Sequence, residues 1–116
     1  MARTIAVGTV YQATDTTKAA FVTVNVDTSL SAIVGALNNV TEVRIGSSAT
    51  GLATGASGFP VARTRSGITG LLAVVGLLLG TGDSLTTLLP PGWFFCVRQA
   101  TGSGTTVSSA YDQSLS

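Results

Sequence analysis

A strict two-residue alternation between Ala20 and Val26 is the feature that most restricts how this chain can fold. Val22, Val24 and Val26 fall on one side of an extended backbone, and aromatic or polar residues fall on the other. Successive side chains point to opposite faces only in a β-strand, and β-branched residues are favoured there. The alternation therefore predicts a strand with one buried and one exposed face.

The rest of the chain has the composition of short strands joined by turns. Thr, Val and Ile are frequent, Lys and Glu are rare, and Gly occurs 14 times. Besides the strand at 20–26, we expect strands over residues 4–14, 40–45, 59–65, 67–79, 84–89, 93–100 and 105–111. We expect turns or loops at 15–18, 38–39, 46–58, 80–83, 90–92 and 101–104, and a polar tail from 112 to 116. About eight strands at this spacing predict a single all-β domain over residues 1–116, a two-sheet antiparallel β-sandwich or jelly roll.

The segment from Ser29 to Leu37 allows two interpretations. Its apolar residues Leu30, Ile33 and Val34, together with Leu37, have the spacing of one helix face, and Asp27 or Thr28 would cap such a helix. A further strand is the alternative, and we prefer it in a chain otherwise made of strands.

Low charge is the second constraint. Charged residues make up 9% of the chain, against about 25% in soluble domains, and mean hydropathy is +0.50. Ser, Thr and Gly protect a strand edge from pairing less well than Lys or Glu. We therefore expect self-association into a homo-oligomer rather than a Thr-rich monomer. The net charge of +1, without a basic run, argues against a nucleic-acid partner.

Two segments are candidates for the interface. The strand expected at 67–79 is apolar on both faces, so one face needs cover from outside its own sheet pair. Arginines share one face of the strand at 59–65, with Arg98 expected nearby, although such arginines are more often simply solvated. Trp93, which follows the proline corner, could anchor an interface, but a tryptophan beside two phenylalanines is more often part of the core. The candidate interface residues are Arg63, Arg65, Leu72, Val74, Leu78 and Trp93.

Nothing in the sequence favours catalysis. Histidine is absent, and the five carboxylates are scattered, so we predict no catalytic residues, no metal site and no cofactor. We expect the aspartates to cap turns and Glu42 and Arg44 to point into solvent. Cys96 stands in an apolar strand and is expected to be a buried, inert thiol.

The start of the chain has no long apolar stretch after a basic residue, so we expect no secretory signal. The apolar run from Ile68 to Leu79 is too short for a membrane helix, so no membrane partner is expected. Synthesis in a host cytoplasm without a signal peptide follows as an expectation.

Both ends of the chain resemble small virion structural proteins of tailed bacteriophages. At the C-terminal end the resemblance covers Thr87–Gln99, with the corner Pro90-Pro91-Gly92 before an aromatic strand, and then a Gly-Ser-Gly tip and a returning strand. At the N-terminal end the resemblance covers the strand Val7–Gln12, a polar turn and Ala20–Val24. The middle of the chain is unmatched.

The resemblance implies a capsid decoration or cement protein located in the virion. It implies a homo-oligomer, expected to be a trimer, that docks on the major capsid protein or another virion protein. A tail spike or fibre domain, or a module that binds carbohydrate or a receptor, is the alternative. Such a module would expose aromatic rings, for which Tyr11, Phe59 and Tyr111 are the candidates.

Overall fold

The computed structural model of the protein describes residues 2–28, 39–66, 81–101 and 105–115. The predictions for Ser29–Leu37, Gly67–Leu79 and the hairpin tip at 102–104 lie outside these residues, and so do Leu72, Val74 and Leu78. The strands are β1 (Ala2–Arg3), β2 (Val10–Gln12), β3 (Ala20–Thr28), β4 (Asn39–Gly46), β5 (Phe59–Ser66), β6 (Thr81–Leu89), β7 (Phe94–Thr101) and β8 (Thr105–Ser114).

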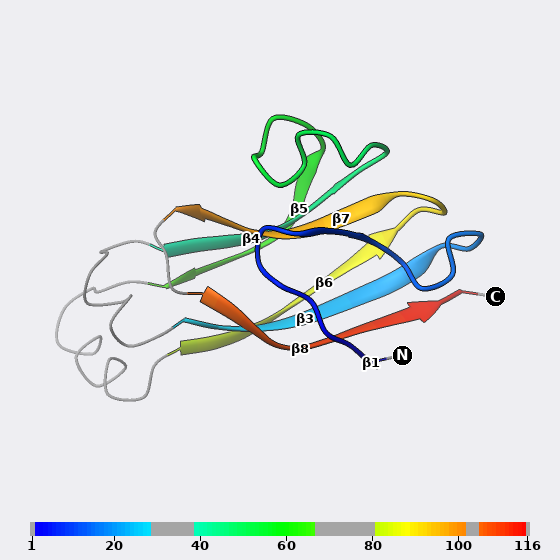
Figure 1. The fold of residues 1–116 in the computed structure, drawn as a ribbon. Helices are drawn as coiled ribbons and strands as arrows, with labels where there is room; N and C mark the ends of the chain where they lie inside the picture. Colours follow the sequence, from blue (N-terminus) through cyan, green and yellow to red (C-terminus); the bar gives the residue numbers. More distant parts are fainter. Residues whose placement is uncertain (1, 29–38, 67–80, 102–104, 116) are drawn as a thin grey trace, which may run out of the picture.

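The strands form two antiparallel sheets of four (Figure 1). Sheet A has the order β1-β8-β3-β6, and sheet B has the order β2-β7-β4-β5. The all-β class is thus confirmed, and the arrangement is that of a β-sandwich. One residue of β8, Ser108, is bulged out of the ladder where β8 pairs with β3.

The core lies between the sheets and is built from alternate residues of each strand. Val22, Val24 and Val26 are at most 2% exposed, whereas Phe21 is 48% exposed, which confirms the predicted two-faced strand. The other large buried members of this core are Ile5, Val43, Ile45, Leu85, Leu89, Phe95 and Val97.

Several predicted boundaries are wrong, among them that of Asn39, which was expected in a turn but opens β4 opposite Ser66. Of the strand expected at 4–14, only Val10–Gln12 forms a strand, because the chain crosses from β1 in sheet A to β2 in sheet B over residues 4–9, where Gly8 turns with φ +84°. Residues 81–83 belong to β6 rather than a turn, and pair with the end of β3. The last strand runs to Ser114, into the segment expected to be a polar tail.

The turns expected at 15–18 and 90–92 both form. The Asp15 carboxylate accepts hydrogen bonds from the Thr17 backbone N–H at 3.0 Å and its hydroxyl at 2.6 Å. These bonds, the hydroxyl one above all, lower the pKa of Asp15. At the proline corner Gly92 has φ +76°, and the Trp93 N–H donates to the Pro90 carbonyl at 3.1 Å.

The loop at 47–58 folds back over the outer side of sheet B (Figure 1). Its one large apolar residue, Leu52, is fully buried, and its backbone closes on itself through a bond from Ala56 N–H to the Gly51 carbonyl at 2.9 Å. The segment expected as a loop is therefore a packed one, because this single leucine anchors it against the sheet.

Gly58→Ala should detach this loop and lower the free energy of unfolding by about 2 kcal/mol. Gly58 has φ +74°, and an added Cβ would overlap the Ile45 carbonyl oxygen and stand 2.5 Å from Leu52 Cδ1. Gly8→Ala is the matched control, because it has φ +84° but open space around the added carbon. Urea unfolding should show a clearly larger loss for Gly58→Ala, and equal losses would contradict this packing role.

Candidate interaction surfaces

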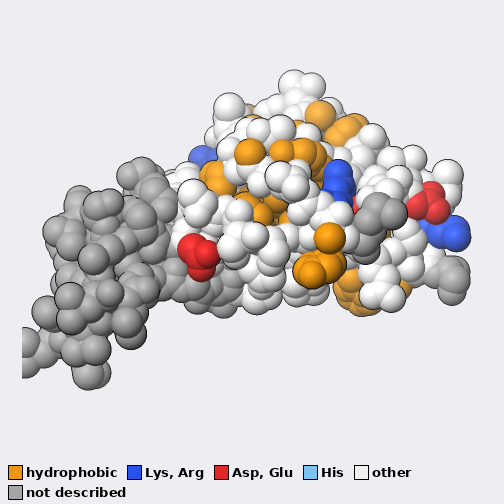
Figure 2. Space-filling model, turned by 60° about the horizontal axis from the view of Figure 1, so that its bottom comes forward, with side chains coloured by type: hydrophobic (Ala, Val, Ile, Leu, Met, Phe, Trp, Pro, Cys, Tyr) orange, Lys and Arg blue, Asp and Glu red, His pale blue; other side chains and the backbone are white. Residues whose placement is uncertain are grey.

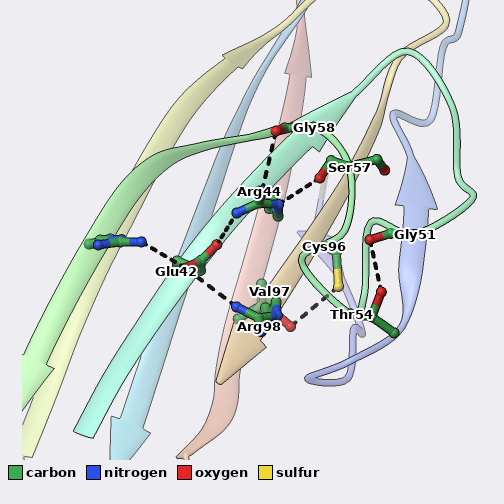
Figure 3. A network of polar contacts seen from close by, with 10 residues as sticks. Glu42, Arg44, Gly51, Thr54, Ser57, Gly58, Cys96, Val97 and Arg98 are labelled. Atoms are coloured by element: carbon green, nitrogen blue, oxygen red, sulfur yellow. Dashed lines mark hydrogen bonds and ion pairs between the residues drawn. The ribbon is translucent and has the colours of Figure 1, made fainter. Parts of the chain in front are cut away.

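A carboxylate surrounded by arginines lies on the outer side of sheet B (Figure 3). Glu42 Oε2 is 2.9 Å from Arg44 Nη1, and Oε1 is 3.2 Å from Arg63 Nη2 and 3.6 Å from Arg98 Nη1. We call these four residues the arginine cluster. The strand register produces it, because Glu42 stands opposite Arg63 on β5 and Arg98 on β7, with Arg44 two residues further along β4.

The predicted solvent exposure of Glu42 is wrong, since it is 1% exposed. Arg44, also expected to be solvated, has a side chain only 14% exposed. Both point away from the core as their alternation requires, but the outward side of β4 is covered there. A buried carboxylate is tolerated only when charge partners and hydrogen bonds compensate its lost hydration, and the cluster supplies both.

The loop at 47–58 is tied to this cluster through two arginines. Arg44 donates from Nε to the Ser57 carbonyl at 2.7 Å and from Nη2 to the Gly58 carbonyl at 3.3 Å (Figure 3). Gly55 lies directly on Arg98, where an added Cβ would be 2.8 Å from the guanidinium carbon. Loop and charges therefore hold one another in place.

Cys96 lies beside the cluster. It is fully buried, as predicted, but it is on the outward side of β7, opposite Arg44, rather than between the sheets. Burial raises the pKa of its thiol, which keeps the sulfur protonated and poorly nucleophilic at neutral pH.

A second buried carboxylate closes one end of the sandwich. Asp112 is 4% exposed; it pairs with Arg3 at 3.0 Å and accepts bonds from the Thr14 backbone N–H at 2.7 Å and from its hydroxyl at 2.8 Å. Burial opposes ionisation, but the Thr14 bonds and the Arg3 charge outweigh it and lower the pKa of Asp112. A turn-capping or solvated role was expected here, and that expectation is wrong.

The outer side of sheet A carries a different surface, which we call the uncharged face. It consists of Phe21, Thr23, Asn25, Ser84, Thr86, Leu88, Ser109, Tyr111 and Gln113, which share one side of three neighbouring strands. Exposed Asp27 follows Asn25 on the same side of β3 and bounds this face at one end. Phe21, Leu88 and Tyr111 are each about half exposed, at 48%, 49% and 52%. In Figure 2 the bottom of Figure 1 comes forward, and a few acidic and basic side chains are visible on that side.

The polar members of this face bond to one another. Thr23 and Thr86 share a hydrogen bond of 3.2 Å between their hydroxyls, and Asn25 Nδ2 donates to the Ser109 hydroxyl at 2.7 Å. These cross-strand pairs satisfy part of their own hydrogen-bonding capacity, so the face costs less to desolvate than free hydroxyls and amides would.

The structure brings together some of the predicted interface residues. Arg63 and Arg98 meet at Glu42, as their expected proximity suggested, while Arg65 lies on β5 opposite Val40. Trp93 is partly buried against the core, and its ring stacks on Phe59 with 6.3 Å between centroids. Their role in an interface stays a prediction.

In the described part of the chain, no three Cys, Asp or Glu side chains gather as metal ligands would. A hollow of about 130 Å³ beside the 47–58 loop is lined by Gly46, Ser47, Ser48, Ser57, Gly58 and Phe59, none of which ionises. The described residues include no helix long and apolar enough to cross a membrane. No family model, curated protein or solved structure matches the chain.

Proposed function

We propose that this chain is a structural subunit that assembles with copies of itself through the uncharged face. The observation that carries the proposal is this face: its large side chains Phe21, Leu88 and Tyr111 are half exposed, and the charged residue on this side of β3, Asp27, lies beyond Asn25 at the end of the face. Burying apolar area gives about 25 cal/mol per Å², and a contact centred on these three residues can leave Asp27 in water and so avoid the cost of desolvating an ion.

We place this assembly role in a tailed-phage virion, as a decoration or cement protein bound to capsid subunits. The support is the resemblance of Val7–Gln12 and Thr87–Gln99 to such proteins. These two segments, far apart in the sequence, are neighbours in sheet B, where Tyr11 stands opposite Phe95. The other resembling residues, Thr87–Leu89 and Ala20–Val24, lie in β6 and β3 of sheet A, so the resemblance draws on both sheets. Many weak contacts repeated over a shell would suffice for cementing.

Leu88→Lys should weaken self-association about tenfold or more, because it places an ammonium group in the contact. The control is Ser47→Lys, which adds the same charge to an exposed residue of the loop over sheet B. Light scattering across a dilution series measures the mass of each variant. A wild-type monomer at every concentration, or equal weakening by both variants, would overturn the proposed assembly through this face.

A carbohydrate-binding or receptor-binding module is the second candidate, favoured by the exposed rings of Tyr111 and Phe59, at 52% and 58%. Tyr11 is less suited, because it is partly buried and its hydroxyl accepts the Ala6 N–H at 2.9 Å. Tyr111 shares its face with Asn25 and Ser109, so ring and polar groups are side by side. Oligosaccharide binding lost in Tyr111→Ala, with a monomeric wild type, would favour this candidate over assembly.

A further inference from the structure

The arginine cluster is not electrically balanced. Three guanidinium groups pair with the single carboxylate of Glu42, which leaves two positive charges in excess within the cluster. The other ion pairs found among the described residues, Arg3 with Asp112 and Lys18 with Asp15, match one cation with one anion. The excess on sheet B therefore stands out in a chain with a net charge of only +1.

Two of the arginines are accessible to solvent, and each pairs with only one oxygen atom of Glu42. Arg63 and Arg98 share the Oε1 atom of Glu42, and the 3.6 Å separation of Arg98 is an ion pair longer than a hydrogen bond. Their side chains are 57% and 25% exposed, whereas that of Arg44 is 14% exposed and bonded to the loop. A guanidinium has five N–H donors, so one shared oxygen leaves most donors of Arg63 and Arg98 to other acceptors.

We propose that Arg63 and Arg98 form a binding site for a carboxylate of an acidic protein segment. Glu42 already shows that one carboxylate oxygen can bridge these two arginines, and a second carboxylate from outside would neutralise part of the excess charge. Paired guanidinium forks suit carboxylates in geometry and strength. A polyanionic backbone is disfavoured because the chain has no basic run to follow it. The site is independent of self-association through the uncharged face.

The test is an NMR titration of the full chain with a hexaglutamate peptide at low salt. We expect saturable shifts of the Gly55, Arg63 and Arg98 amides, and an affinity at least about tenfold weaker in Arg63→Gln. Lys18→Gln, which removes a charge from a distant exposed turn, should bind as wild type does. Leu88→Lys should also bind normally, which separates this site from the assembly proposal.

The proposal is overturned if no saturable shift occurs at these amides, or if Arg63→Gln binds as tightly as wild type. It is also overturned if inorganic phosphate gives the saturable shifts and hexaglutamate does not, because the site would then select a tetrahedral anion. Arg63 is more than half exposed, so its replacement should leave the fold intact, and the unshifted part of each spectrum reports this directly.

Discussion

Glu42→Gln will lower the free energy of unfolding by about 3–5 kcal/mol, the largest effect we expect from a single substitution. The carboxylate is 1% exposed and joins arginines from three strands. Glutamine keeps the shape but removes the negative charge, so the arginines are left close together without their counter-charge. Arg44 contributes most to the loss because it is the least exposed of them. Chemical denaturation of both proteins at neutral pH measures the difference.

A double variant makes this prediction sharper. Glu42→Gln combined with Arg63→Gln should recover part of the lost stability, because it removes one of the repelling charges. Lys18→Gln, which breaks an exposed ion pair with a separation of 4.0 Å, should change stability little. A loss below about 1 kcal/mol in Glu42→Gln, or no recovery in the double variant, would show that the cluster is well solvated and contributes little.

The sequence predicts that Arg44 and Glu42 face away from the core, and they do. It could not predict that the side of the strand on which they lie is buried. Alternation is local information, and it assigns each residue to one side of a strand. Cover on that side comes from a loop that returns over the sheet. The sequence feature that indicates this cover is Leu52, a lone large apolar residue in a segment of small and polar ones. One such residue does not show by itself which surface the loop will contact.

The N-terminal segment shows the same limit. The alternation of residues 4–14 predicts one strand, but only Val10–Gln12 pairs in sheet B, with Tyr11 opposite Phe95, and the strand before it, with Arg3 opposite Ala110, belongs to sheet A. Pairing partners distant in sequence cannot be deduced from a two-residue period. Of the candidate site, the strand pattern places Arg63 and Arg98 each on one face of a strand, whereas their meeting at Glu42 depends on β4 lying between β5 and β7, which the pattern does not contain.

Asp112→Asn should reduce stability by about 2–3 kcal/mol at neutral pH. The Asp112 carboxylate joins Arg3 of β1 to Thr14 beyond β2, so it fastens the segment that crosses between the sheets to the last strand. Asparagine can still accept the Thr14 N–H, but it loses the charge that pairs with Arg3. The N-terminal segment should loosen first, and amide hydrogen exchange at its residues should rise more than at the centre of β3.

The pH dependence of stability distinguishes the effect of the Asp112 charge from the effect of its packing. The pKa of Asp112 is lowered in the folded protein, so its stabilising contribution is present above the unfolded value of about 3.9 and is lost as pH falls through the lower folded value. The stability difference between wild type and Asp112→Asn should therefore be constant from pH 7 to about 5 and shrink in more acidic solution. Asp15→Asn, which removes an exposed carboxylate, should leave most of the acid sensitivity in place. A difference that stays the same below pH 4 would mean that Asp112 acts through its shape, and that neither its ion pair with Arg3 nor the bonds from Thr14 favour its ionised form.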